Sequence, residues 1–102
     1  MIMHPRFPVI DHERKVVLTY DFSVALPAGV SLSGIPTAEV LVSFGVDATA
    51  SSIVTAVSLV GSSVLLAVSG VKDQTDYDIK VVCETTNAGI NMVFTQTLPV
   101  RD

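Results

Sequence analysis

The stretch 76–100 reads DYDIKVVCETTNAGINMVFTQTLPV, and it decides how the rest of the chain can fold. In its first half, apolar side chains occupy every second position, at Tyr77, Ile79, Val81 and Cys83. Successive side chains of a strand point to opposite faces, so this period places the apolar set on one face. Residues 87–89 (Asn-Ala-Gly) suit a tight turn. The stretch therefore predicts a long antiparallel hairpin with one face in a core.

Strand patterns also occur at residues 15–22, 30–32, 37–44, 53–59 and 64–69. Turn signals rich in Gly, Pro and Ser separate them at 27–29, 33–36 and 61–62. No amphipathic helix pattern interrupts this order. The chain therefore predicts an all-β fold, an immunoglobulin-like or fibronectin-type β-sandwich of six to seven antiparallel strands.

The inward parities of these strands predict the core. If the chain follows the fibronectin-type pattern, the hydroxyl of a buried Tyr77 also needs a backbone partner. The expected core residues are Val16, Leu18, Tyr20, Val40, Val42, Phe44, Tyr77, Ile79, Val81, Met92 and Phe94.

Length and composition bound the class of protein. The chain has 102 residues, which corresponds to one domain, and its single cysteine, Cys83, rules out a disulfide within the chain. A net charge of −4 disfavours nucleic-acid binding, which needs a basic surface. Charged residues make up 16% of the chain, below the ~25–35% common on soluble surfaces. Another chain is therefore expected to cover part of this surface, unless Ser and Thr supply its polarity.

Residues 1–12 predict an extended N-terminal arm, and residues 13–102 form the expected sandwich domain. Pro5 and Pro8 favour extended backbone, and the apolar residues Phe7, Val9 and Ile10 lie beside them as potential anchors. Two interpretations remain open. The arm docks on a neighbouring chain through Phe7 and Ile10, or it is the first edge strand of its own domain.

Residues 48–71 carry no charge. Their length would suffice for a membrane span, but residues 61–63 (Gly-Ser-Ser) interrupt them, and Val, Ile and Thr favour strands. Two strands are therefore expected. Both parities of these strands are apolar or small, so apolar side chains remain outside whichever face is buried. We expect self-association here, with Val54, Ala56, Leu65 and Leu66 as candidate interface residues.

Candidate chemistry is sparse. Asp11, His12 and Glu13 are adjacent, whereas metal ligands normally come from spaced residues on a rigid frame. The serines lie in no Gly-x-Ser-x-Gly motif, and no glycine-rich phosphate loop follows a strand. We therefore expect no catalytic residues, no metal site and no cofactor. The start of the chain lacks a secretion signal, which favours synthesis in a cytoplasm.

The order of several segments resembles a family of tailed-bacteriophage structural proteins, the phage fibre–tail adaptor proteins. The resemblance rests on FPVIDHE at 7–13, LTYDFS at 18–23, GVSL at 29–32, YDIKV at 77–81, Thr-Thr before the Gly89 hairpin, and LPVR at 98–101. Arg14 and Lys15 depart from the acidic run typical of that family. The resemblance implies an immunoglobulin-like fold, no catalysis and several copies per virion.

The resulting expectation is a non-enzymatic virion structural protein that links a tail fibre or spike to the tail or portal region. The alternative is a capsid cement protein, and a third candidate is an adhesion module. The expected partners are other virion proteins and further copies of this chain, with no nucleic acid and no membrane. The protein is expected to be made in the cytoplasm of a bacterial host and to reside in the virion.

Overall fold

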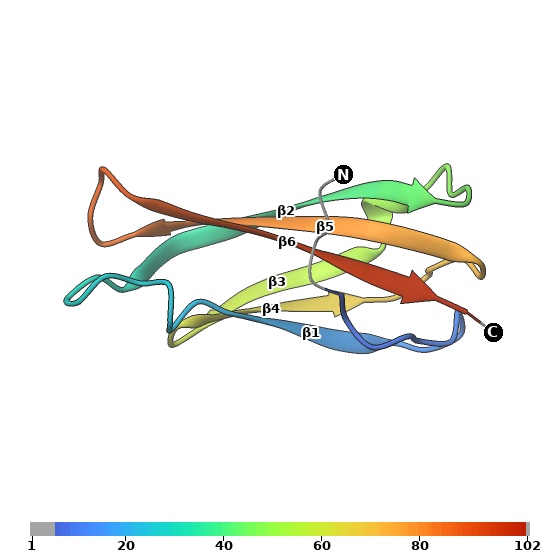
Figure 1. The fold of residues 1–102 in the computed structure, drawn as a ribbon, viewed down its shortest axis with the longest axis horizontal. Coiled ribbons are helices and arrows are strands. Elements are labelled where there is room, and N and C mark those ends of the chain that lie inside the picture. Colours follow the sequence, from blue (N-terminus) through green and yellow to red (C-terminus); the bar gives the residue numbers. More distant parts are fainter. Residues whose placement is uncertain (1–5, 102) are drawn as a thin grey trace.

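A computed structural model describes residues 6–101 of the chain. These residues form two three-stranded antiparallel sheets that lie face to face as two layers (Figure 1). One sheet has the order β1-β4-β3 and the other the order β2-β5-β6. The predicted all-β sandwich is confirmed at this level. The element bounds are β1 Val16–Asp21, β2 Leu32–Phe44, the short 3-10 helix η1 Ala50–Ser52, β3 Val54–Val60, β4 Ser63–Val68, β5 Thr75–Thr85 and β6 Asn91–Val100.

The hairpin predicted from residues 76–100 is the pair β5–β6, with Tyr77 opposite Leu98 and Val81 opposite Phe94. The side chain of Asn87 holds its turn by accepting the backbone N–H of Gly89 at 3.0 Å. A second hairpin joins β3 to β4 through Gly61 and Ser62, and Gly61 adopts the positive φ of 58° that favours glycine. The uncharged stretch 48–71 therefore forms η1 and this hairpin. Within residues 6–101, no helix is long and apolar enough to cross a bilayer.

The core lies between the two sheets and takes side chains from both. The hydroxyl of Tyr20 on β1 crosses this core and donates to the carbonyl of Ile79 on β5 at 2.7 Å, so it ties the sheets together. Leu18, Tyr20, Tyr77, Ile79 and Val81 are buried as predicted. Val16, Val40, Val42 and Met92 are half-buried and pack against the core.

The strand β2 differs from the sequence prediction at both ends. Residues 30–32 and 37–44 were expected as separate strands, whereas one strand runs from Leu32 to Phe44. The register shifts between Ser33 and Thr37, where Gly34 adopts a φ of 73°. This bulge accommodates Pro36 within the strand, because proline has no N–H to donate to the neighbouring strand. The expected turn is therefore a bulge within one strand.

Phe44 was predicted to be buried, and this prediction is wrong because the side chain is 57% exposed. A second register shift lies between Val42 and Phe44, where one extra residue, Ser43, enters the strand. The extra residue reverses the parity and turns Phe44 outward. Phe94 has the predicted inward parity opposite Val81, but it lies on the edge strand β6 and remains 36% exposed.

The described part of the N-terminal arm lies along the edge of β6 and runs parallel to it. Bridges join Arg6 to Thr97 and Ile10 to Val100. The N–H groups of Phe7 and Ile10 donate to the carbonyls of Thr97 and Pro99 at 2.8 and 3.1 Å, and the N–H of Arg101 donates to Ile10 at 3.0 Å. The arm is thus an edge segment of its own domain over residues 6–10.

Candidate protein–protein interface

The outer face of the β1-β4-β3 sheet carries small and apolar side chains. The register of the three strands arranges them in rows, because side chains opposite one another on paired strands share a face. We call the eight uncharged residues of these rows the outer patch. The rows are Val17, Ala67 and Ala56; then Thr19, Leu65 and Ser58; then Ser63 and Val60, with Asp21 at the corner.

The apolar members of the outer patch lie open to solvent at its two sides. Val17 is 64% exposed on β1 and Val60 is 58% exposed on β3, while Leu65 and Ala67 are half-buried on the central strand β4. Single exposed apolar residues are common on protein surfaces. Here the residues that lie between the two valines carry no charge, and the cores of interfaces are depleted of charged residues.

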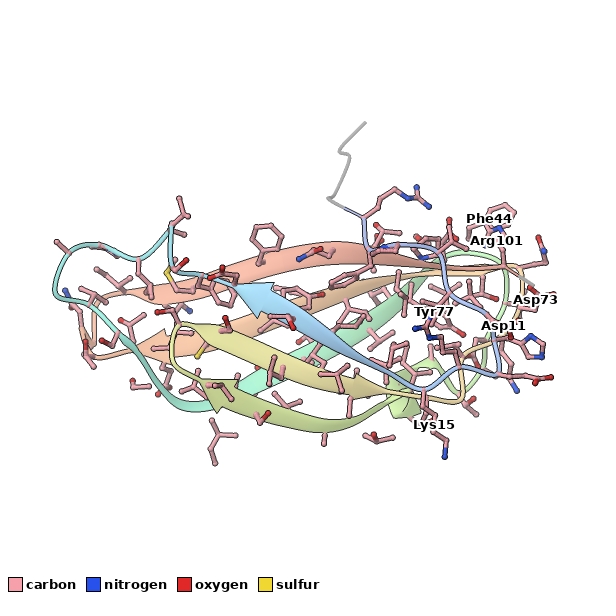
Figure 2. The ribbon with its side chains drawn as sticks, turned by 90° about the horizontal axis from the view of Figure 1, so that it is seen from below. Asp11, Lys15, Phe44, Asp73, Tyr77 and Arg101 are labelled. Atoms are coloured by element: carbon pink, nitrogen blue, oxygen red, sulfur yellow. The ribbon has the colours of Figure 1, made fainter. Side chains whose placement is uncertain are left out.

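An open hollow of about 220 Å³ lies at the end of the outer patch where β1 begins. The small side chain of Ala67 leaves room there between Val17 and Thr55. Lys15 lines the same hollow and gives that end of the face a positive charge, and Figure 2 shows this residue where the chain enters β1. The hollow can therefore receive an apolar side chain beside a carboxylate.

Only two of the six candidate interface residues lie on this face. Ala56 is exposed, and Leu65 lies diagonally across from it on β4. Leu66 is fully buried in the core, and Val54 packs against the core from the inner side of β3. Sequence reasoning missed Val17 and Val60, although the polar parity of Val17 on β1 was a usable signal.

The two arm residues, Phe7 and Ile10, contact their own domain. Ile10 is 7% exposed within the core cluster. Phe7 is half-buried, and its ring meets that of Tyr20 edge to face, with centroids 5.4 Å apart. Both side chains therefore pack on their own domain, as in the edge-strand interpretation of the arm.

An ionic cluster fastens the arm and the C-terminal end of β6 to β5. Asp76 is 9% exposed, and its two carboxylate oxygens lie 3.2 Å from Arg6 Nη2 and 2.9 Å from Arg101 Nη1. The guanidinium of Arg101 also lies over the ring of Phe44, 5.4 Å from its centroid, and Figure 2 shows these two residues together. The cluster therefore has a structural role that no local sequence pattern indicated.

Tyr77 links three segments at the same end of the domain. Its hydroxyl donates to Asp47 Oδ2 at 2.6 Å and accepts the N–H of Lys72 at 2.8 Å, so the expected backbone partner is present. Burial and the hydrogen bond to Asp47 raise the pKa of Tyr77 to about 12. Hydrogen bonds from Tyr77 and Thr49 outweigh desolvation and lower the pKa of Asp47. Tyr77 is therefore a neutral phenol that donates a hydrogen bond to the Asp47 carboxylate, and this arrangement suits a structural role.

The remaining reactive groups do not converge. Asp73 accepts the N–H of Gln74, and Asp78 accepts the hydroxyl of Thr97 at 2.7 Å, while Asp76 is held by arginines. Burial raises the pKa of the Cys83 thiol, which makes it less reactive. Among residues 6–101, no three His, Cys, Asp or Glu side chains are placed to hold a metal ion. The second histidine of the chain, His4, lies outside the described residues.

Comparisons with protein-family models, with curated proteins and with solved structures found no match. Any functional inference therefore depends on the geometry of the chain itself and on the sequence resemblance given above.

Proposed function

We propose that this protein is a non-enzymatic structural component of a tailed-bacteriophage virion, an adaptor that links a tail fibre or spike to the tail or portal region. It acts by binding other virion proteins and further copies of itself, and it binds neither nucleic acid nor a membrane. It is made in the cytoplasm of the bacterial host and resides in the virion.

The outer patch is the observation that carries this proposal. Interface cores are depleted of charged residues, and the three rows of this face contain one charged side chain, Asp21, at a corner. An adhesion module would instead need an exposed aromatic platform. Phe44 is the most exposed aromatic side chain of the described residues, and the guanidinium of Arg101 lies over its ring.

The strand order supports the immunoglobulin-like part of the proposal. In that fold, strands B, E and D share one sheet and C, F and G the other. With β1 taken as strand B, the observed sheets β1-β4-β3 and β2-β5-β6 have the same order. Tyr77 then lies near the start of strand F, and its hydroxyl bonds to backbone five residues upstream at Lys72, as in a tyrosine corner.

The decisive experiment quantifies the protein in phage particles purified from a host that carries the gene. We expect on the order of tens of copies per particle by quantitative mass spectrometry, whereas hundreds would identify a cement protein. Leu65→Glu should reduce incorporation at least about tenfold, because a charge enters the centre of the interface. Leu41→Glu, at a 71% exposed leucine of the other sheet, is the matched control and should incorporate normally. Particles without the protein would refute the proposal.

A further inference from the structure

We propose that residues 91–96 of the edge strand β6, which we call the open edge, accept an extended segment of another polypeptide as an added strand. The segment that fits is uncharged, with apolar side chains at alternate positions, one of which packs against Phe94. This site goes beyond the proposed function, because it lies on the other sheet from the outer patch and uses none of its residues.

The N-terminal arm already shows how β6 binds a strand along this side. Phe7 donates its N–H to the carbonyl of Thr97 at 2.8 Å, and its ring meets that of Tyr20 edge to face. The described part of the arm begins at Arg6, opposite Thr97, so nothing within residues 6–101 pairs with the open edge. The arm therefore covers only the second half of β6.

The backbone of the open edge is oriented to pair with a further strand. In an antiparallel ladder, the N–H and C=O of one residue point to the same side, and alternate residues point to opposite sides. The carbonyls of Thr97 and Pro99 point to the arm, and β6 pairs with β5 without a register shift. Asn91, Val93 and Thr95 share this parity. Their N–H and C=O groups therefore point away from β5, toward the proposed site.

The other three edges of the two described sheets carry features that oppose strand addition. β2 has two register shifts and contains Pro36, β3 has a register shift near its start, and β1 is six residues long and ends in Asp21. Bulges, prolines, charges and short strands are the usual means by which proteins block an edge. The open edge has no charge, no proline and a regular register. It is therefore the edge best suited to accept a strand.

Phe94 gives the open edge an apolar contact as well. Its ring lies edge to face with the rings of Tyr20 and Phe22, at centroid distances of 6.1 and 6.3 Å, yet 36% of the residue remains exposed. Side chains on the same face of neighbouring strands contact one another. An apolar side chain of the added strand would therefore cover Phe94, as Phe7 of the arm covers Tyr20.

Two occupants from this chain itself fit less well. If residues 1–5 continued the register of the arm, Pro5 would face the carbonyl of Thr95, to which proline has no N–H to donate. If β6 of a second copy paired antiparallel about Val93, its Thr97 would face Gly89, and the arm bound there would meet the hairpin turn. A segment of another polypeptide avoids both conflicts.

The test is an amide NMR titration of the purified full chain with a synthetic heptapeptide. In this peptide threonine alternates with apolar residues, a phenylalanine stands at the centre, and both ends are capped. We expect shifts centred on residues 91–96 and a Kd of roughly 0.1–1 mM, as for a short unconstrained peptide. Val93→Pro removes an N–H that β5 does not use and should raise this Kd more than about tenfold. The control Val93→Thr keeps the N–H and should change the Kd less than about twofold.

A second pair of peptides makes the test independent of any change in the protein. Methylation of alternate backbone nitrogens blocks the donors on one side of an extended peptide and leaves those on the other side free. We expect one of the two methylation patterns to abolish binding and the other to preserve it, because only one side of the peptide pairs with β6. Thermal melts establish that the Val93 variants are folded.

Four results would overturn the inference. The first is the absence of shifts at residues 91–96 up to about 5 mM peptide, well above the expected Kd. The second is binding that neither Val93→Pro nor either methylation pattern weakens. The third is binding only after residues 1–5 are deleted, which would identify that segment as the occupant. The fourth is a concentration-dependent shift of residues 91–96 without peptide, which would identify a second copy.

Failure of the proposed function is distinguishable, since it is measured by presence in phage particles and by the effect of Leu65→Glu. Peptide binding at the open edge without virion incorporation would refute the adaptor role and leave the strand-acceptor site intact.

Discussion

The outer faces of the two sheets differ in charge far more than in exposed apolar surface. On the β2-β5-β6 sheet, Glu39 lies opposite Lys80 at the centre of the face, and Asp78 and Glu84 flank them. That face still exposes Leu41 at 71% and Val93 at 49%. On the β1-β4-β3 sheet, the only charges lie at the ends of β1.

This difference in charge separates the solvated face of the domain from the proposed docking face. Both faces carry exposed apolar side chains, so apolar exposure alone does not distinguish them. Docking onto the β2-β5-β6 face would remove water from four charged groups, and such desolvation is costly without new partners. The outer patch has almost no such cost, because serine, threonine and alanine separate its apolar side chains.

The largest loss of stability is expected when a charge is introduced at an inward position of β4 rather than at the neighbouring outward position. Leu66 is fully buried, so Leu66→Glu should cost at least roughly 3–5 kcal/mol, a large share of the stability of a small domain. Leu65→Glu, one residue earlier and facing out, should keep the melting temperature within about 5 °C. Circular dichroism melts measure both, and equal losses would mean that the two sides of β4 are assigned wrongly.

The next prediction compares the loss of stability on truncating two phenylalanines, one buried between the sheets and one exposed on the surface. Phe22 is 2% exposed and packs near Phe94, so Phe22→Ala should cost about 3–5 kcal/mol. Phe44→Ala removes an exposed ring and one contact with Arg101, which should cost less than about 1 kcal/mol. Urea unfolding gives the two free energies; a cost above about 2 kcal/mol for Phe44→Ala would contradict its outward position.

The hydrogen bonds of Tyr77 to Asp47 and Lys72 should contribute less to the stability of the domain, and their contribution should depend on pH. Tyr77→Phe removes the hydrogen bonds to Asp47 and Lys72 and should cost about 1–2 kcal/mol. Because folding raises the pKa of Tyr77 to about 12, this contribution is complete below pH ~10 and is lost as pH rises toward 12. Burial raises the pKa of Tyr20 as well, so Tyr77→Phe should reduce the alkaline loss of stability without abolishing it. An identical alkaline profile in the variant would contradict this role.

The smallest effect concerns the charged face. Glu39→Lys would place two lysines opposite each other across β2 and β5 and should cost roughly 0.2–1 kcal/mol, decreasing as salt is added. Glu39→Gln is the matched control because it removes the charge without reversing it. A Glu39→Lys variant as stable as Glu39→Gln at low salt would show that cross-strand charge contributes nothing here.

Local periodicity predicted the parts of the fold in which neighbours along the chain decide the outcome. The alternation from Tyr77 to Cys83 corresponds to a fully buried row, and the Gly-Ser turn joins β3 to β4 as expected. Of the outer patch, the sequence prediction named Ala56 and Leu65. The sides of β4 could not be distinguished from sequence, because Leu65 and Leu66 are both apolar and only pairing with β1 and β3 decides which one is buried.

Local sequence patterns could not predict the features that depend on one inserted residue or on residues far apart in the chain. Ser43 adds a single residue to β2, which is enough to turn Phe44 outward. Asp76 meets Arg6 and Arg101 from opposite ends of the chain, and no local spacing joins positions so far apart. The burial of Ile10 follows from the same long-range closure of the arm on β6.

The parallel pairing of the arm with β6 has a mechanical consequence. Tension that pulls residue 6 and residue 101 apart would draw the arm and β6 past each other in opposite directions along their length. The three hydrogen bonds formed by the N–H groups of Phe7, Ile10 and Arg101 would then bear the load together rather than open one after another. The pairing therefore places the domain in a shear geometry, which resists stretching more strongly than unzipping from one end.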